Sequence, residues 1–205
     1  MQQNIENEIS WSENNPWIKK GHFLMRWPFV CPNRHNYAWR VVRENTREIL
    51  RNYLAQRKIR IHKALIAPCG VCADQDILGG LAEEFYGIDI SRKVIEECPA
   101  MIYKKVGDIL NNGYDSDCFD AVASFLFFHH LHRVGFQPYL NEFRRILKTE
   151  GLLFILEPGN LYPFGWLMSL GKGIFGNVSG LVPDEKPISP VKFHAILRQE
   201  GFKIE

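Results

Sequence analysis

The chain has 205 residues, of which 46% are hydrophobic and 23% charged, and its formal net charge is +2. These proportions are those of a globular protein, and they exclude disordered, collagen-like and coiled-coil chains. The length suits one α/β domain with a covered core and a small extension. Five cysteines without a dense spacing pattern favour reduced thiols and a cytoplasmic location over a disulfide-bonded secreted fold.

Residues 1–16 are polar and end in Asn-Asn-Pro, so we expect a loosely attached arm. This stretch has neither the basic nor the apolar region of a signal peptide. The longest apolar segment, Leu161–Val182, contains Lys172, and a lysine in mid-span costs roughly 2.5–3.5 kcal/mol in a bilayer. We therefore predict no transmembrane span.

The positive charge is concentrated in one segment. Between Lys19 and Lys63 there are twelve Lys or Arg and two Glu, a net charge of +10, so the rest of the chain carries −8. Within it, residues 36–56 have a helical period, with an apolar face (Ala38, Trp39, Val42, Ile49, Leu50, Tyr53) and an arginine stripe (Arg40, Arg43, Arg47, Arg51). Such a helix packs on the acidic remainder of the chain or attracts an anionic partner. Residues 1–62 are interpreted as an N-terminal arm and helical extension, and residues 63–205 as the α/β domain.

From residue 63 onwards, apolar runs alternate with helical patterns. The runs are 63–67, 85–90, 101–106, 119–125 and 152–156, and a sixth begins near residue 201; helices are expected after Asp74, after Ser91, over 136–147 and over 190–199. Several runs are apolar on both faces, which predicts a Rossmann-like, doubly wound, mainly parallel sheet with helices on both faces. Ligands of such sheets bind outside the carboxyl ends of the strands, so we seek function in the loops there.

These loops carry a pattern typical of a nucleoside site. Gly70, after the first run, lets the backbone approach a ligand closely. Asp89 ends the second run 19 residues later, the separation at which a carboxylate meets ribose hydroxyls in dinucleotide-binding folds. Asp108 follows the third run and is placed to accept from an adenine amino group. The fourth run ends in Ser124-Phe-Leu-Phe-Phe-His-His.

The segments in this order resemble the class I S-adenosylmethionine-dependent methyltransferases. Ala64-Leu-Ile-Ala-Pro-Cys-Gly-Val-Cys resembles the first cofactor loop of that family, Phe85-Tyr-Gly-Ile-Asp-Ile-Ser its ribose-binding strand end, and Lys105-Val-Gly-Asp-Ile its adenine loop. Residues 119–131 resemble its fourth strand with the histidine-containing end, and residues 142–158 the helix and strand that follow. The resemblance spans residues 63–158 and says nothing specific about the methyl acceptor.

The resemblance implies S-adenosylmethionine as cofactor and S-adenosylhomocysteine as product. The cofactor-binding residues that it implies are Ala67, Pro68, Cys69, Gly70, Cys72, Asp89, Ile90, Asp108, Ile109, Ser124 and Phe125. The first loop would hold the methionine part, Asp89 the ribose and Asp108 with Ile109 the adenine. His129 and His130 are candidate catalytic bases, because imidazole titrates near neutral pH; the alternative is that one of them is a buried, hydrogen-bonded structural residue.

Three departures from the family pattern support a different interpretation, a degenerate, non-catalytic methyltransferase-like subunit. Ile66 replaces an acid, and Pro68 and Cys72 replace glycines, which removes an amide donor and narrows the space for the methionine part of the cofactor. The chain also ends at Glu205, so the last strand of the family sheet is missing. The edge of the fifth strand is then open to a partner chain.

Two further features bear on ligands. Cys69-x-x-Cys72 with His129, His130 and His132 has a zinc-like composition, but a second ligand pair of the right spacing is missing, so we predict no metal. The aromatic segment 161–170 after the fifth run suits an apolar lid, or a helix that closes the core. We therefore predict a methyltransferase for a small or lipid-like acceptor, with RNA or a phosphorylated metabolite as the alternative acceptor.

Overall fold

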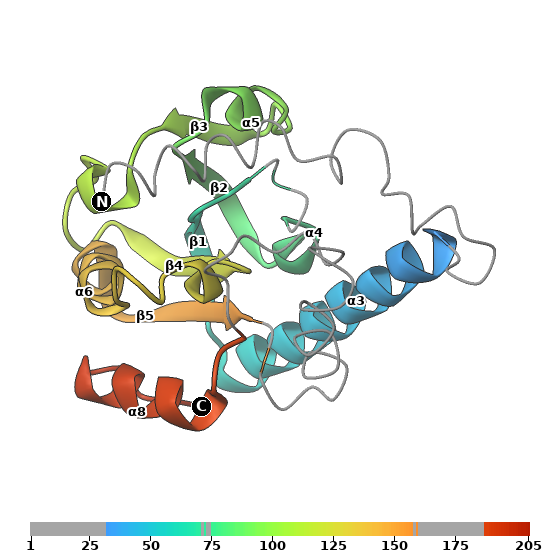
Figure 1. Ribbon diagram of the computed structural model, residues 1–205. Helices are drawn as coiled ribbons and strands as arrows, with labels where there is room; N and C mark the ends of the chain where they lie inside the picture. Colours follow the sequence, from blue (N-terminus) through green and yellow to red (C-terminus); the bar gives the residue numbers. More distant parts are fainter. Residues whose placement is uncertain (1–31, 71, 73–74, 158, 160–186) are drawn as a thin grey trace, which may run out of the picture.

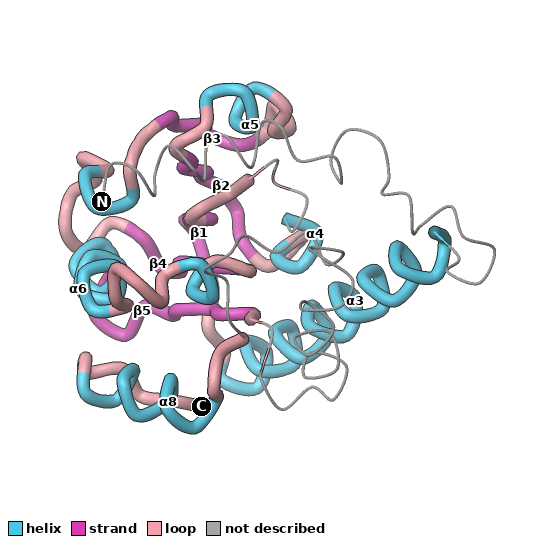
Figure 2. The backbone as a smooth tube through the Cα atoms, in the orientation of Figure 1, coloured by secondary structure: helices cyan, strands magenta, loops and turns pink. Residues whose placement is uncertain are grey.

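The computed structural model describes residues 32–70, 72, 75–157, 159 and 187–205 (Figure 2). The expected N-terminal arm and the aromatic segment 161–170 lie outside these residues, as does the apolar stretch 161–182. Among the described residues, no helix is both long enough and apolar enough to cross a membrane.

The described elements alternate as the sequence predicts. In chain order they are α3 (Pro32–Arg57), β1 (Ile61–Ile66), α4 (Gln75–Leu78), β2 (Ala82–Asp89), α5 (Arg92–Glu96), β3 (Ile102–Val106), η2 (Ile109–Asn111), β4 (Phe119–Phe125), η3 (Phe128–His130), α6 (Gln137–Ile146), β5 (Leu147–Leu156) and α8 (Pro190–Gln199). The expected sixth strand is wrong: after the turn at Gly201 the last residues form no strand. Glu205 instead pairs with Arg57 and Lys203, which holds the tail beside the end of α3.

The strands form one sheet in the order β3-β2-β1-β4-β5, and every neighbouring pair is parallel. The chain winds outwards from β1 to β3, returns to the centre and winds outwards again through β4 and β5. The direction of winding therefore reverses between β1 and β4, and in such sheets the ligand crevice lies outside the carboxyl ends of the strands at that reversal. The fold is the predicted doubly wound, Rossmann-like sheet.

Helices cover both faces of the sheet (Figure 1). On one face, Ala64, Ile66 and Ala121 pack with residues of α3, α4 and α5. On the other face, Leu65 and Val122 pack with residues of α6 and α8. Successive residues of a strand point to opposite faces, so strands that are apolar throughout are those covered on both sides.

Helix α3 begins four residues before the predicted start, at Pro32, and proline is favoured in the first turn of a helix. It packs on the sheet through Leu50, Tyr53 and Leu54, which follow the i, i+3, i+4 spacing. The sequence placed Ile49 on the same face, but this side chain is 68% exposed. Neighbouring helical residues point about 100° apart, so Ile49 lies beside the buried stripe.

Asp120 joins three strands at their amino ends. One carboxylate oxygen accepts hydrogen bonds from the backbone N–H groups of His62 (3.0 Å) and Lys63 (2.8 Å), and the other accepts from Lys148 Nζ at 2.7 Å. Partial burial alone would raise the pKa of Asp120, but Lys148 and the two amides lower it below its ordinary value. The carboxylate therefore stabilises the fold in its charged form.

We predict that Asp120→Asn lowers the free energy of unfolding by about 1–2 kcal/mol at pH 7, because one charge-assisted acceptor is lost. A carboxyl whose pKa is lowered by folding contributes stability above its unfolded pKa and loses it as the pH falls through the folded pKa. Urea unfolding should therefore give the wild type and Asp120→Asn nearly equal free energies of unfolding in acid. The exposed Asp115→Asn is the control, and a difference that persists unchanged in acid would contradict the prediction.

Candidate functional site

The loop after β1 folds back on the end of β2. Cys69 N donates to the carbonyl of Ile88 at 2.9 Å, and Gly70 N donates to Asp89 Oδ2 at 2.9 Å. Gly70 has φ +52°, a conformation that glycine adopts without a side-chain penalty. The structure therefore brings together Gly70 and Asp89, as the sequence predicts.

Asp89 is a buried carboxylate at the end of β2, with 9% of the residue exposed. Besides Gly70 N, it accepts from Ser91 N at 3.0 Å. Burial raises the pKa of Asp89, although the amides of Ser91 and Gly70 oppose this shift. A carboxylate has about four lone-pair sites, so acceptor capacity is left for hydroxyl groups of a ligand.

The loop after β3 lies next to Asp89. Gly107 N donates to the Asp89 carbonyl at 2.9 Å, and Asp108 begins the short helix η2 by accepting from Leu110 N at 2.9 Å. Ile109 is buried below it, 6% exposed. The loops that follow β1, β2 and β3 thus meet at one edge of the sheet. Asp89, at the end of β2, lies between the loop after β1 and the loop after β3.

At the end of β4, Ser124 and Phe125 are both buried. Among the described residues, the Ser124 hydroxyl is a buried polar group without a hydrogen-bond partner. The chain then turns through Leu126, whose N–H donates to the Leu156 carbonyl at 2.8 Å. This turn places the backbone of the residues after Leu126 next to the end of β5.

Glu157, directly after β5, organises this second part of the site. Its carboxylate accepts from the backbone N–H groups of Phe127 (2.6 Å) and Phe128 (2.7 Å) and lies 2.8 Å from His129 Nδ1. The side chains of His129 and Glu157 are only 11% and 6% exposed. The ring of His130 lies 4.0 Å from that of His129.

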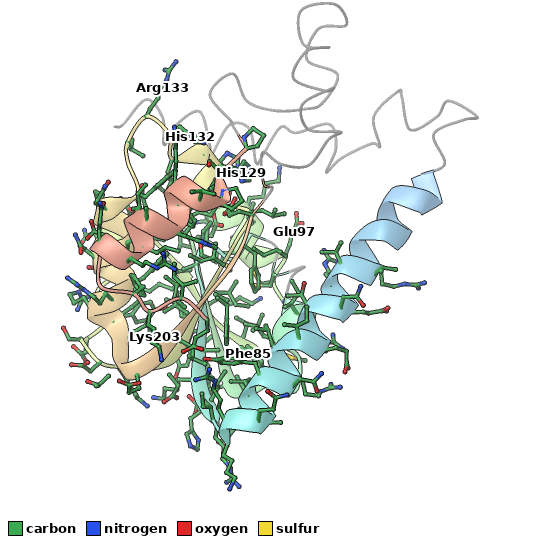
Figure 3. The ribbon with its side chains drawn as sticks, turned by 90° about the horizontal axis from the view of Figure 1, so that it is seen from below. Phe85, Glu97, His129, His132, Arg133 and Lys203 are labelled. Carbon is green, nitrogen blue, oxygen red and sulfur yellow. The ribbon has the colours of Figure 1, made fainter. Side chains whose placement is uncertain are left out.

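Sequence reasoning did not select Glu157 as a site residue. The signal was present, because Glu157 is an acid immediately after an apolar strand, as are Asp108 after β3 and Asp89 at the end of β2. Figure 3 shows His129 at the same end of the molecule as His132 and Arg133, and Lys203 towards the opposite end. The histidine pair therefore lies at the ligand-binding end of the sheet.

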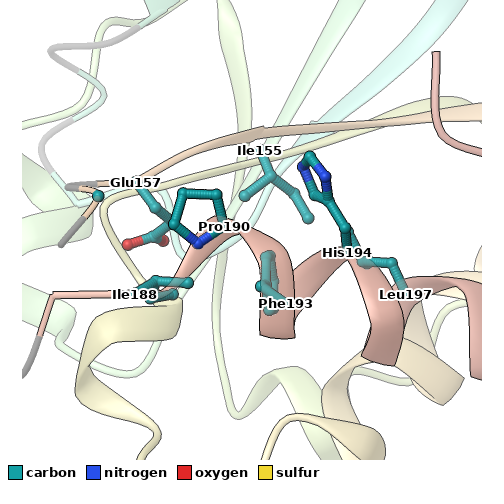
Figure 4. Close-up of a pocket in the computed structure, with 8 residues that line it drawn as sticks. Ile155, Glu157, Ile188, Pro190, Phe193, His194 and Leu197 are labelled. Carbon is teal, nitrogen blue, oxygen red and sulfur yellow. The ribbon is translucent and has the colours of Figure 1, made fainter. Parts of the chain in front are cut away.

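A cavity of about 170 Å³ opens beside Glu157, between β5 and α8. Its lining includes Ile155, Ile188, Phe193 and His194. In Figure 4, Glu157 and Pro190 lie at one end of this cavity and His194 and Leu197 at the other. The lining mixes apolar side chains with a carboxylate at one end and an imidazole at the other.

The side chains of Cys69 and Cys72 turn away from this edge into the core on the α3 face, where Cys98 meets them. The three sulfur atoms lie within 4.8 Å of one another. The contacts with Cys69 and Cys72 lower the pKa of Cys98 to about 4, although burial opposes this shift. The contacts with Cys72 and Cys98, together with burial, raise the pKa of Cys69 far above its ordinary value.

Comparison with known proteins agrees with this geometry. Residues 66–155 match the sequence profile of a family described as a methyltransferase domain. This part of the chain, 90 of its 205 residues, is similar to a methyltransferase domain. The match begins at the last residue of β1 and ends within β5, so the methyltransferase domain includes every loop described above except the one that carries Glu157. S-adenosylmethionine is the cofactor of this family.

Solved structures share the fold of this methyltransferase domain at low sequence identity. A SAM-dependent methyltransferase from Thermotoga maritima has 16% identity and a TM-score of 0.62, over 83% of this chain and 78% of that one. Magnesium protoporphyrin IX methyltransferase from Synechocystis PCC 6803, solved with bound S-adenosylhomocysteine, has 17% identity and a TM-score of 0.60, over 81% and 76%.

A third structure, from a complex of the Haloferax volcanii Trm112 methyltransferase activator with a methyltransferase, has 17% identity and a TM-score of 0.54, over 71% of this chain. The match covers 62% of the Haloferax chain, which is less than two thirds of it. No curated protein sequence matches this methyltransferase domain significantly.

The packing of the cofactor loop on β2 can be tested at Gly87. A Cβ atom there would lie 3.1 Å from Cys69 Sγ and 3.2 Å from Ile102 Cγ2, which is tighter than most Cβ contacts and would require these neighbours to shift. We predict that Gly87→Ala lowers the free energy of unfolding by about 1–3 kcal/mol, the usual cost of overpacking, as measured by urea unfolding. Gly107→Ala is the matched control, because its nearest contact is an ordinary 3.6 Å. Equal losses of unfolding free energy in Gly87→Ala and Gly107→Ala would contradict the close packing of the cofactor loop at Gly87.

Proposed function

We propose that this chain is an S-adenosylmethionine-dependent methyltransferase that acts on a small, largely apolar acceptor and uses His129 as its base. The observation that carries this proposal is the His129–Glu157 pair, 2.8 Å apart, at the same edge of the sheet as the Asp89 loops. A buried imidazole held by a buried carboxylate is an arrangement for proton transfer. A structural histidine would make the same contact, so the activity of the His129→Asn variant below decides between the two roles.

The residues at the edge of the sheet fit the cofactor. Asp89 would hold the ribose with its remaining acceptor capacity, and the loops of Gly70 and Asp108 would flank it. The amides of Cys69 and Gly70 are engaged with Ile88 and Asp89, and Pro68 has no N–H, so these three residues would contact the cofactor without donating backbone hydrogen bonds to it. When bound, S-adenosylmethionine supplies an electrophilic methyl group.

The departures at Ile66 and Cys72 are accommodated by the core. Ile66 is 2% exposed and packs on the α3 face, so an apolar residue is suited to this position. Cys72 is 1% exposed and its sulfur lies 2.8 Å from Cys98 Sγ. Its side chain therefore occupies the core.

Glu157 orients the base. A carboxylate beside Nδ1 favours the tautomer with the proton on Nδ1, which leaves the lone pair of Nε2 to accept a proton from a hydroxyl or amine acceptor. The imidazolium so formed lies next to a buried negative charge, which stabilises it. Glu157 is thus a positioning residue, and His129 is the residue that would contact the acceptor.

The class of acceptor is inferred from the cavity between β5 and α8. Ile155, Ile188 and Phe193 give this cavity apolar walls that suit a small or lipid-like molecule. Glu157, which holds His129, lies at one end, so the acceptor would have to extend past Glu157 to reach the imidazole. RNA is less favoured, because Arg40 and Arg51 on α3 already pair with Glu44 and Glu48. The proteins whose solved structures share this fold act on different molecules, so the fold alone does not identify the methyl acceptor.

A partner chain at the edge of the sheet is a separate proposal. Within the described residues, β5 pairs with β4 on one side and is the last strand of the sheet on the other. An edge strand offers backbone groups to a further strand. The Haloferax methyltransferase was solved in a complex with an activator protein, which supports looking for such a partner.

The cofactor site is tested first. We predict that Asp89→Ala weakens binding of S-adenosylhomocysteine by about 10–100-fold, because hydrogen bonds to a charged acceptor contribute about 1.5–3 kcal/mol each. Isothermal titration measures the change, with Asp115→Asn as the control that should bind like the wild type. A folded wild-type chain that binds neither S-adenosylmethionine nor S-adenosylhomocysteine would support the non-catalytic subunit instead.

The base is tested by release of S-adenosylhomocysteine with a panel of phenols, amines and lipids. We predict that His129→Asn lowers kcat by about 10²–10⁴-fold and leaves binding of S-adenosylhomocysteine unchanged. The exposed His132→Asn should keep full activity; an equal loss there would argue against the assignment.

A further inference from the structure

Three buried thiols from separate parts of the chain converge beneath the cofactor loop. Cys69 and Cys72 follow β1, and Cys98 follows α5, 26 residues after Cys72. All three sulfur atoms lie within 4.8 Å of one another, and the residues are 7%, 1% and 4% exposed. The fold therefore supplies a ligand that the zinc-like spacing in the sequence lacks.

The backbone directs these thiols to one point. Cys72 has φ +56°, a conformation that residues other than glycine disfavour, and its N–H donates to the Cys69 carbonyl at 2.8 Å. This tight turn brings the two side chains of the loop to the same side. Strained residues of this kind are concentrated at functional sites.

The spacing of the sulfur atoms suits a shared cation. Cys98 Sγ lies 2.8 Å from Cys72 Sγ and 4.0 Å from Cys69 Sγ. Around a tetrahedral zinc ion with Zn–S bonds of about 2.3 Å, the sulfur atoms would be roughly 3.8 Å apart. The Cys69–Cys98 distance is close to this value, whereas Cys72 and Cys98 would have to move apart by about 1 Å to bind the ion.

The histidines considered with these cysteines in the sequence are placed elsewhere. His129 contacts Glu157 at the ends of β4 and β5, whereas the thiols lie in the core on the opposite face from α6 and α8. The ligands that the described residues offer are therefore three thiolates. Soft sulfur ligands select zinc and copper(I) over magnesium and calcium.

We propose that Cys69, Cys72 and Cys98 form a binding site for a thiophilic metal ion, Zn²⁺, that fastens the cofactor loop to the end of α5. Zinc is tetrahedral in structural sites, so a fourth ligand besides these three thiolates would be needed to close the site. The role of the ion is structural, because the thiols are buried below the loop and away from the acceptor cavity. The proposal is independent of the methyltransferase activity, since metal binding is measured without cofactor or acceptor.

The experiment uses the full chain, stripped with a chelator under reducing conditions and titrated with Zn²⁺ alone against a chromophoric competitor. We expect a single ion per chain and a rise in Tm of roughly 5–10 °C at saturation, because an ion that binds only the folded state stabilises it. Cys98→Ser should weaken binding at least tenfold. Cys118→Ser, which alters a cysteine outside the cluster, is the matched control and should bind like the wild type.

A second measurement on the wild type covers the case in which Cys98→Ser does not fold. Zn²⁺ should protect three thiols of the chain from a thiol-specific reagent, and the chelator should restore their reactivity. The proposal is overturned if the reduced wild type binds no Zn²⁺ or if Cys98→Ser binds it as tightly as the wild type. It is also overturned if the mass of the protein purified without reductant shows a Cys72–Cys98 disulfide in place of metal.

Discussion

Buried carboxylates that accept backbone N–H groups are the constraint on which the described site depends. A carboxylate removed from water is costly unless hydrogen bonds replace its hydration. Asp89 meets this requirement with the amides of Gly70 and Ser91, and Glu157 meets it with the amides of Phe127 and Phe128. Each acid therefore determines the path of the loop that satisfies it, and the loops in turn position every candidate site residue.

The two acids divide the edge of the sheet into two parts with different chemistry. The part around Asp89 joins the loops after β1, β2 and β3, and its buried carboxylate suits a ligand rich in hydroxyl groups. The part around Glu157 joins the ends of β4 and β5, and it holds an imidazole next to an apolar cavity. A cofactor at the first part and an acceptor at the second would face each other across the point where the winding of the sheet reverses.

Secondary structure and the cofactor side were largely predictable because their signals are local. Runs such as 119–125 are apolar throughout, and only a strand covered on both faces explains this in an α/β pattern. Asp89 and Asp108 were found because each lies at or just after the end of an apolar run. The exposed Ile49 on α3 was misplaced, since a helical period does not say which of two adjacent stripes meets the sheet.

The sequence by itself determined the order of the elements, the parallel sheet and the position of the cofactor loops, because hydrophobic periodicity and strand-end residues depend on near neighbours in the chain. Only the tertiary structure decided which distant residues meet. Glu157 is 28 residues from His129, and Cys98 is 26 residues from Cys72. Such contacts depend on the order in which parallel strands are placed side by side, and no local pattern encodes that order. The acid–imidazole pair and the thiol cluster therefore became visible only in the folded chain.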